Sequence, residues 1–377
     1  MSATPAEAPA RTSAMGIATV LISVVVATAA LRWLRDILTP LALAFFLVVM
    51  IDGFVRALRT RLRGVSERAV GPIALVAAVV LFGGAVYILA ESGSSFFGRL
   101  MSYQPQINGL IARFAAMFHV AVPPTVDELL QQLNPTRYLG PVAGALQGVV
   151  EHAIFVLIYV GFLMASRRGF ERKVVRLFPE REDRRDAVEV FTRIRDGVES
   201  YLFIQTLTGL VIAFMAFVLM SILGLDNAFF WAFLIFFLSY IPIIGGAVGI
   251  ALPPLFALVQ FPTFWQAGVL LVVMWFVHFF IGNVVLPKMQ GDSMNVDPIV
   301  VLLSLGFWGA LWGIPGMFMS TPLTVMVMVV LAQFDGSRWI AVLLSHTGDP
   351  LHTRDPPSPE HALDAKPRQP EEVTSNA

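Results

Sequence analysis

Long runs of apolar residues limit this chain more than any other feature of its sequence. A run of about 20 such residues is the length of helix that crosses the roughly 30 Å hydrocarbon core of a bilayer. Charged residues make up only 14% of the chain, against about 25% in soluble domains. The runs therefore predict an all-α, polytopic membrane protein. In the first two thirds of the sequence they cover residues 15–31, 37–55, 69–90, 149–166 and 201–223.

Charge balance and motif content exclude several classes of function. Lys and Arg number 26, as do Asp and Glu, so no basic excess exists to neutralise phosphates and no nucleic-acid partner is expected. The absence of cysteine excludes thiolate metal sites and thiol nucleophiles. No Walker lysine motif, Gly-x-Gly-x-x-Gly or His-x-x-x-His pair occurs, which argues against ATP coupling, dinucleotide chemistry and zinc hydrolysis. We therefore expect no enzyme activity, no cofactor and no metal site.

The distribution of basic residues predicts the orientation in the membrane. Five Arg separate the second and third runs and ten Lys or Arg lie within 167–199, whereas the 58 residues of 91–148 carry three. Loops rich in Lys and Arg stay in the cytoplasm. The N- and C-termini are therefore predicted to be cytoplasmic and residues 91–148 extracytoplasmic. Arg32 and Arg35 lie in a turn predicted to be outside and are the exception to this pattern.

The interruptions between the runs divide the chain into segments of different character. Residues 91–148 space apolar side chains as a helix does and contain a capping-box pattern at Thr125 and Glu128, so we expect a small helical cap. Opposite charges recur four residues apart in 167–200, as in a solvated helix. The expected organisation is a disordered cytoplasmic tail (1–14), spans one to three (15–90), the cap (91–148), span four (149–166), a charged cytoplasmic helical segment (167–200), spans five to eight (201–335) and a disordered cytoplasmic tail (345–377).

Two apolar stretches in the last third are too long to be single straight spans. Residues 228–261 (34 residues) and 299–334 (36 residues) would each be about 50 Å long as helices. Each carries proline and glycine near its middle, so we expect broken helices or re-entrant hairpins whose freed backbone groups face protein or water. With a regular span at 264–285 between them, about eight membrane segments are expected, two of them broken or re-entrant.

The two breaks are the candidate transport path, because unwound helix turns expose N–H and C=O groups that can replace water around a polar solute. Proline frees a carbonyl by removing a helical donor; in the alternative interpretation, proline and glycine only kink and pack helices. Gln205, Tyr240 and Asn283 are expected to supply side-chain hydrogen bonds, and Lys288 to hold an anionic or hydroxyl-rich solute. The backbone positions are Pro242, Gly245, Gly246 and Pro253 in the first break, Pro287 and Gly291 in the connecting segment, and Gly313, Pro315, Gly316 and Pro322 in the second break.

Three ionisable residues in or beside apolar runs are candidates for proton coupling. Glu151 and His152 open the fourth span near the predicted outer face, and His278 lies about fourteen residues into the seventh segment. Ionisable groups are costly within a bilayer and therefore often functional. The alternative interpretations are interfacial solvation of the first pair and a neutral, hydrogen-bonded histidine at 278.

The last hundred apolar residues contain a series of short motifs in a fixed order. They are Ile241-Pro242-Ile243-Ile244-Gly245-Gly246, Ala251-Leu252-Pro253-Pro254, Asn283-Val284-Val285-Leu286-Pro287-Lys288-Met289-Gln290-Gly291, Gly306-Phe307-Trp308-Gly309, Gly313-Ile314-Pro315-Gly316 and Thr321-Pro322. Together with Tyr201-Leu202 and Gln205, they resemble the signature of the autoinducer-2 exporter (AI-2E) family of bacterial permeases. Gly246 stands where that family often has proline. The resemblance implies about eight membrane segments, a place in the bacterial inner membrane and transport of small molecules, but no single substrate; members have been linked to quorum-signal export and to sodium/proton exchange.

Three functions fit these observations. The first is a permease or exporter that moves a small polar, quorum-signal-like solute along the two breaks. The second, a sodium or lithium/proton antiporter, needs a buried carboxylate, but Asp226, Asp292 and Asp297 all fall at the ends of spans. The third is a non-transporting scaffold that recruits envelope proteins through 91–148 and 167–199. The expected partners are the lipid bilayer, a small polar solute, a coupling ion if transport is ion-driven, and further copies of this chain, because the aromatic seventh segment and the cap offer surplus surface.

Overall fold

The computed structural model describes residues 14–61, 67–119, 128, 152–166, 169, 176–177, 181–290, 295–334 and 336–350. Within these residues every regular element is a helix, and one isolated antiparallel bridge joins Val296 to Ser345. The all-α prediction is confirmed for this part of the chain. Five helices are long and apolar enough to cross a membrane, by length and composition. The count of about eight membrane segments stays a prediction.

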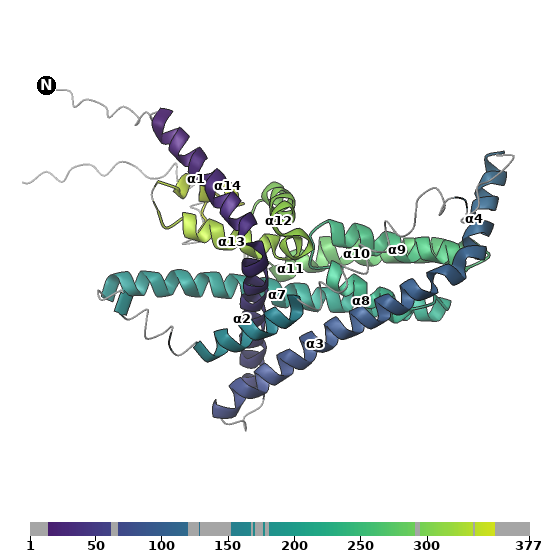
Figure 1. Ribbon diagram of the computed structural model, residues 1–377, viewed down its shortest axis with the longest axis horizontal. Helices are drawn as coiled ribbons and strands as arrows, with labels where there is room; N and C mark the ends of the chain where they lie inside the picture. The colour runs from purple at the N-terminus through teal and green to yellow at the C-terminus, as the bar shows by residue number, and fades with distance from the viewer. Residues whose placement is uncertain are drawn as a thin grey trace, which may run out of the picture.

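The first three long helices take different directions: the first projects from the molecule, the second crosses its middle and packs on later helices, and the third runs along it (Figure 1). They are α1 (Ala14–Trp33), α2 (Arg35–Arg61) and α3 (Glu67–Leu100). Helix α3 continues past position 90, where the sequence predicts the third span to end, and leads through η1 (Met101–Tyr103) into α4 (Gln104–Met117). The helix expected from the capping box lies outside the described residues apart from the single residue 128, so the complete cap stays a prediction.

Helix α7 (Arg181–Leu223) is continuous over 43 residues. Its first half is charged, and Arg193 pairs with Glu189 one turn earlier at 2.6 Å. Glu199 pairs with Arg56 of α2 rather than with an arginine of its own helix. The charged segment and the fifth apolar run are thus one helix, which α2 contacts near the point where the charges end.

Helices α8 (Ala228–Leu238) and α9 (Ile244–Gln260) fold back on each other as a hairpin. Their far ends are joined, because the Gln260 side chain accepts a hydrogen bond from the Asp226 N–H at 2.8 Å and donates to a backbone carbonyl at the end of α7 at 2.9 Å. The tip of the hairpin is the turn at 239–243. The first overlong apolar stretch is therefore two antiparallel helices.

A long helix with one widened turn connects this hairpin to the next. It consists of α10 (Trp265–Phe280), the π-helical turn η2 (Ile281–Val285) and α11 (Leu286–Gln290). Pro287 lacks an N–H, and its ring crowds the carbonyl four residues earlier, so a wider turn relieves the clash without ending the helix.

Helices α12 (Pro298–Phe318) and α13 (Ser320–Leu331) form the second hairpin. The Trp308 indole N–H on α12 donates to the Thr324 hydroxyl on α13 at 3.1 Å. The short helix α14 (Arg338–Leu344) follows and leads back to the residues just before α12, where the isolated bridge forms. The second overlong stretch therefore also folds back, and its open end is closed by the segment after α13.

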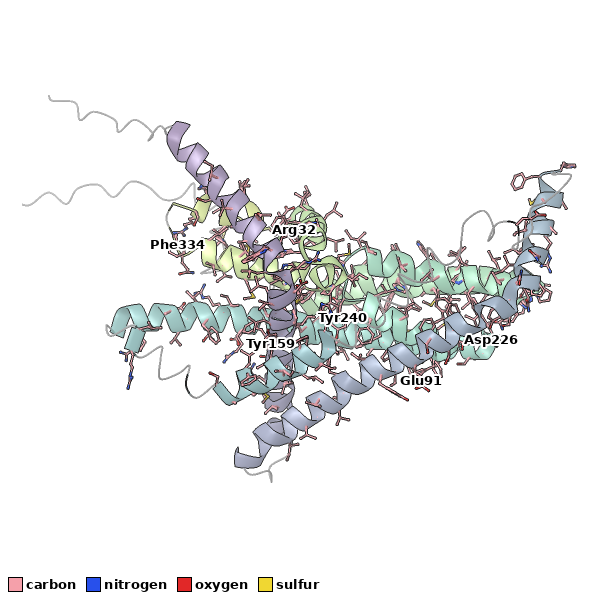
Figure 2. The ribbon with its side chains drawn as sticks, viewed as in Figure 1. Arg32, Glu91, Tyr159, Asp226, Tyr240 and Phe334 are labelled. Atoms are coloured by element: carbon pink, nitrogen blue, oxygen red, sulfur yellow. The ribbon has the colours of Figure 1, made fainter. Side chains whose placement is uncertain are left out.

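The two hairpins open at opposite ends of the molecule and meet tip to tip. The Tyr240 ring, at the tip of the first, stacks on the Phe318 ring, at the tip of the second, with ring centres 4.6 Å apart. Figure 2 shows Tyr240 midway along the long axis, between Asp226 at the open end of the first hairpin and Phe334 just beyond the open end of the second. The breaks predicted from proline and glycine thus converge in space.

Buried aromatic side chains fix the first hairpin to the neighbouring helices. The Phe96 ring of α3 lies 5.2 Å from the rings of Phe230 and Trp231 on α8 and 5.5 Å from that of Phe256 on α9. Offset and edge-on aromatic pairs of this kind add about 0.5–1.5 kcal/mol beyond the burial of their area. Both arms of the hairpin are therefore held against α3, and its tip is positioned by a rigid base.

Candidate functional site at two helix breaks

The first break is a tight turn with a strained backbone. Ile243 has φ 64° and ψ −58°, and the Ile244 N–H donates to the Pro242 carbonyl at 2.6 Å. This three-residue turn is rare, and a β-branched residue seldom adopts it. Gly245 follows where a Cβ would overlap the Leu238 carbonyl, so only glycine lets α9 start this close to α8. Pro242 and Gly245 therefore form the break, as predicted.

Gly246 and Pro253 lie inside α9 rather than at the break itself. Gly246 is in the first helical turn, where proline is tolerated because the N–H there has no helical partner; a proline, as in the resembling AI-2E sequences, and this glycine are thus compatible with the same break. Pro253 is fully buried within the helix. A Cβ at Gly246 or Gly249 would lie in ordinary contact with the His278 ring of α10, so these glycines lie beside the histidine but are not sterically required there.

The second break has two parts. Gly313 has φ 66° and ψ −144° inside α12, a conformation essentially reserved for glycine. At Gly316 a Cβ would overlap the Trp308 carbonyl, so glycine allows the chain to turn back tightly toward α13. Pro315 lies two residues after Gly313 and can donate no backbone hydrogen bond. Pro322 is buried in the first turn of α13, where proline begins a helix without cost.

Polar side chains of α7 surround the point where the tips meet. The Gln205 amide donates to the Ser239 carbonyl, and the Tyr201 hydroxyl donates to the Tyr240 carbonyl across a long contact of 3.5 Å. The Tyr240 hydroxyl lies 2.7 Å from the Thr206 hydroxyl. Freed carbonyls of the first break are thus bonded by side chains of a neighbouring helix. We call the set Tyr201, Gln205, Thr206, Ser239, Tyr240, Phe318 and Thr321 the tip cluster.

The tip cluster is buried or half-buried and is uncharged. Tyr201, Tyr240 and Thr321 are each exposed by 5% or less. The Thr321 hydroxyl faces that of Tyr201, yet it makes no hydrogen bond of good geometry among the described residues. The members of the tip cluster offer hydroxyls, one amide and backbone carbonyls, and none carries a formal charge at neutral pH. Within the described residues no group of three or more His, Asp or Glu gathers as a metal site would require.

Several predicted residues lie away from the tip cluster. Asn283 is exposed in the π-helical turn, where its amide donates to the Phe279 carbonyl of its own helix at 2.9 Å. Pro287 and Lys288 are exposed in the first turn of α11. The structure therefore does not bring the connecting segment to the meeting point of the tips. Gly291, also predicted for this segment, lies outside the described residues.

The candidate proton-coupling residues are also separate from the tip cluster. His278 is half-buried, and its Nδ1 lies 2.9 Å from the Met274 carbonyl one turn earlier, an arrangement typical of a neutral imidazole that donates to its own helix. His152 is exposed at the start of the helix His152–Ser166, and Glu151 lies outside the described residues. A role for these residues in proton coupling stays a prediction.

Of the tip cluster, only Gln205 and Tyr240 were predicted from the sequence as path residues. Five members were missed: Tyr201, Thr206, Ser239, Phe318 and Thr321, of which Tyr201 and Thr321 occur in the motifs shared with the AI-2E family. A usable signal existed for Thr206, since Gln205, Thr206 and Thr208 form a polar group within an otherwise apolar run. The Thr208 hydroxyl is bonded to its own helix, at 2.8 Å from the Ile204 carbonyl, so the sequence alone does not separate the threonine that faces the site from the one that does not.

Comparison with known proteins identifies the family. A family model described as AI-2E family transporter matches residues 21–336. This chain belongs to the AI-2E family. The AI-2 transport protein TqsA of Escherichia coli (strain K12) is 28% identical over 323 residues, which cover 84% of this chain and 91% of that protein. YhhT of the same strain is 25% identical over 328 residues, which cover 86% of this chain and 92% of YhhT.

Family membership confirms the resemblance noted from the motifs. The match includes both hairpins and the whole tip cluster. AI-2E family members are transport proteins, and the long apolar helices of this AI-2E protein fit a multi-pass membrane protein. The protein is accordingly a membrane permease.

Proposed function

We propose that this AI-2E protein moves a small, uncharged polar solute across the bacterial inner membrane through the tip cluster. The observation that carries the proposal is the tip-to-tip contact of two hairpins that open at opposite ends, with Tyr240 stacked on Phe318. Discontinuous helices that meet in this way are where transporters place their binding sites, because unwound turns offer backbone polarity in the middle of the bilayer.

One arm of each hairpin is too short to cross the membrane. Helix α8 has 11 residues and α13 has 12, so each is roughly 17–18 Å long at 1.5 Å per residue, about half of a ~30 Å core, whereas their partners α9 and α12 have 17 and 21 residues. Two re-entrant hairpins of this length, inserted from opposite faces, would bring their tips together near the midplane. This supports a path in which the tip cluster separates the two sides.

Contacts with neighbouring segments support an assignment of the two faces. The open end of α8 and α9 contacts the segment expected outside, because the Tyr103 hydroxyl of η1 donates to the Asp226 carboxylate at 3.0 Å. The open end of α12 and α13 lies at the other end of the molecule, beside the C-terminal residues. Together with the positive-inside pattern, this supports the proposal that both termini lie in the cytoplasm.

The chemistry of the tip cluster favours a neutral, hydroxyl-rich solute. Its groups already bond to one another in this conformation, as Gln205 does to the Ser239 carbonyl and Tyr240 to Thr206. A solute with several hydroxyls can replace these bonds one for one, whereas an ion would lose more hydration energy than neutral groups return. The relative TqsA carries AI-2 in its name, so a quorum-signal-like molecule of this kind is the solute we propose.

The experiment uses purified protein in liposomes loaded with AI-2, with release followed by mass spectrometry. Pro242→Ala combined with Gly316→Leu alters both tips and should lower the release rate by about tenfold or more, since misplacement near a binding site often costs that much. The matched control is Gly306→Leu, which changes α12 where the structure leaves open space. Release at the parent rate by a variant with a normal size-exclusion profile would refute the proposal.

The antiporter alternative is tested in the same liposomes. Cation exchange requires an ionisable group on the path, and the tip cluster has no carboxylate. We therefore expect that an acid pulse inside the liposomes produces no sodium- or lithium-dependent recovery of a pH-sensitive dye. Recovery that depends on either cation would favour the antiporter instead.

A further inference from the structure

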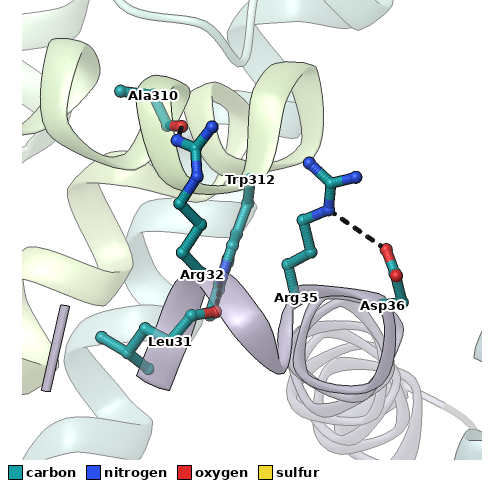
Figure 3. Close-up of polar contacts among 6 residues, drawn as sticks. All are labelled: Leu31, Arg32, Arg35, Asp36, Ala310 and Trp312. Atoms are coloured by element: carbon teal, nitrogen blue, oxygen red, sulfur yellow. Dashed lines mark hydrogen bonds and ion pairs between the residues drawn. The ribbon is translucent and has the colours of Figure 1, made fainter. Parts of the chain in front are cut away.

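A reciprocal pair of hydrogen bonds joins the end of α1 to the Gly313 break of α12. The Arg32 guanidinium donates through Nη1 to the Ala310 carbonyl at 3.0 Å, and the Trp312 indole N–H donates to the Leu31 carbonyl at 3.1 Å. Figure 3 shows both side chains crossing between the two helices in opposite directions. Each helix therefore supplies one donor and one acceptor to the contact.

Both acceptors are carbonyls that their own helices leave free. In a regular helix the Ala310 carbonyl would bond the N–H four residues later, but the non-helical φ and ψ of Gly313 lie between them. Leu31 is in the last turn of α1, where carbonyls have no partner within the helix. A freed carbonyl within an apolar surrounding needs a donor, and Arg32 and Trp312 provide one for each helix.

Arg32 is also unusual for its place in the sequence. It lies in a turn predicted to be extracytoplasmic, where basic residues are few. The neighbouring Arg35 lies in the same turn, but its guanidinium pairs locally with Asp36 at 3.3 Å, and Figure 3 shows it bonded to Asp36 and not to Ala310 or Trp312. The chain thus offers two arginines three positions apart, of which Arg32 is bonded to the break and Arg35 is not.

The contact is linked to the second hairpin through two tryptophans. The Trp312 ring lies 5.2 Å from the Trp308 ring, and the Trp308 indole bonds the Thr324 hydroxyl on α13. A change at Arg32 can therefore alter the position of α12 relative to α13 without any contact between Arg32 and the tip cluster.

We propose that these two bonds are a latch and that Arg32 is a positioning residue, which holds the Gly313 break of α12 in its present shape and so controls how readily the second hairpin rearranges. The role of that rearrangement in transport rests on the proposed function of the tip cluster. The latch itself does not, because it concerns only the shape of the break.

The first experiment measures the shape of the break directly. The chain has no cysteine, so Ile314→Cys provides a single thiol beside Gly313 at a side chain that is 72% exposed. In that background Arg32→Gln should change the rate of alkylation by N-ethylmaleimide by about tenfold, the scale expected for loss of a charge-assisted hydrogen bond. Arg32→Lys keeps a charged donor and should restore a rate close to that of the parent.

The matched control is Arg35→Gln, which removes the same charge one turn away and should leave the alkylation rate unchanged. Trp312→Phe keeps the ring but removes the indole donor, and should change the rate in the same direction as Arg32→Gln. Because the two bonds act as one unit, the double variant should change the rate by less than the product of the single effects. An unchanged rate in Arg32→Gln, or an equal change in Arg35→Gln, would overturn the latch.

Transport gives a second, independent measurement. In the AI-2 release assay, Arg32→Gln should change the maximal rate and leave KM unchanged, because Arg32 does not belong to the tip cluster; Arg32→Lys should restore the maximal rate. A change in KM alone would contradict a positioning role. If the alkylation rates change as expected but neither the parent nor any variant releases AI-2, the proposed function fails and the latch stands. If AI-2 is released but alkylation never changes, the latch fails and the proposed function stands.

Discussion

Gly313 and Gly316 lie three residues apart in the same break, but glycine is required at each for a different reason. At Gly313 the space is open and the backbone conformation is the constraint, since φ is 66°. At Gly316 a Cβ would overlap the Trp308 carbonyl, so the constraint is space. Gly306, one helix turn before Gly309 and facing open space, shares neither constraint and serves as a reference within α12.

This difference gives a prediction for stability. Gly316→Ala should lower the free energy of unfolding by about 1–3 kcal/mol, the usual cost of forcing an extra methyl into a packed site. Gly306→Ala should be neutral or raise it by up to about 1 kcal/mol, because alanine favours a helix over glycine. Chemical denaturation in detergent, followed by helical circular dichroism, measures both. Equal stability of the two variants would show that Gly316 is not sterically required.

Single residues also show how far the candidate site was predictable. Gln205 and Tyr240 were assigned to the path from the sequence, and the structure places both at the meeting tips. Asn283 was assigned on the same grounds, but it is exposed and bonded within its own helix. A polar side chain in an apolar helix is visible in the sequence, whereas the face it occupies depends on what packs beside that helix.

At the scale of elements, the segment after α13 makes defined contacts as far as position 349. These contacts include the first residues of the tail that the sequence predicts to be disordered from position 345. Asn295 is the centre of these contacts. Its amide donates to the Asp349 carbonyl at 2.6 Å, and its side-chain oxygen accepts from the N–H and the hydroxyl of Thr347 at 3.0 and 2.9 Å. The Asp297 N–H donates to the Leu344 carbonyl at 3.1 Å. We call residues 344–349 the strap; it closes the open end of the second hairpin.

The strap gives a graded prediction. Asn295→Ala removes three hydrogen bonds and should accelerate amide exchange at His346 and Thr347 by about 100- to 200-fold, at roughly 1 kcal/mol per bond. Thr347→Val removes the bond from the hydroxyl to Asn295, at 2.9 Å, and the longer one that the hydroxyl accepts from the Asp349 N–H, at 3.4 Å; it should have a smaller effect, of about five- to tenfold. Hydrogen–deuterium exchange with mass spectrometry resolves this segment. If the two variants exchange alike, the side chain of Asn295 does not hold the strap.

At the scale of the whole molecule, the arrangement of hairpins decides the topology. If both hairpins are re-entrant, the residues that flank each one lie on the same side of the membrane. If either stretch crosses the bilayer only once, its flanking residues lie on opposite sides. A cytoplasmic C-terminus, as the sequence predicts, results if both stretches are re-entrant and also if both cross once. The side of the C-terminus therefore does not distinguish the two topologies, and each hairpin has to be tested separately.

Labelling of single cysteines tests the topology in this cysteine-free chain. Ser221→Cys and Thr263→Cys flank the first hairpin, and both should react with an impermeant maleimide added outside intact cells. Lys288→Cys and Gly336→Cys flank the second, and both should react only in inside-out vesicles. All four positions are exposed in the structure. Reaction of Ser221→Cys and Thr263→Cys from opposite sides would mean that the stretch of α8 and α9 crosses the membrane once instead of folding back.

The sequence by itself determined the membrane character of this protein, its all-helical fold, its family and the positions of the two breaks. These follow from local properties, because hydrophobic length and the backbone effects of proline and glycine act within a few residues. Only the tertiary structure decided that both long stretches fold back and that their tips meet. It also decided which side chains bond the freed carbonyls, as Arg32 does for Ala310 from 278 residues away. Such pairings depend on how helices pack, and packing joins residues whose spacing in the sequence carries no signal of their contact.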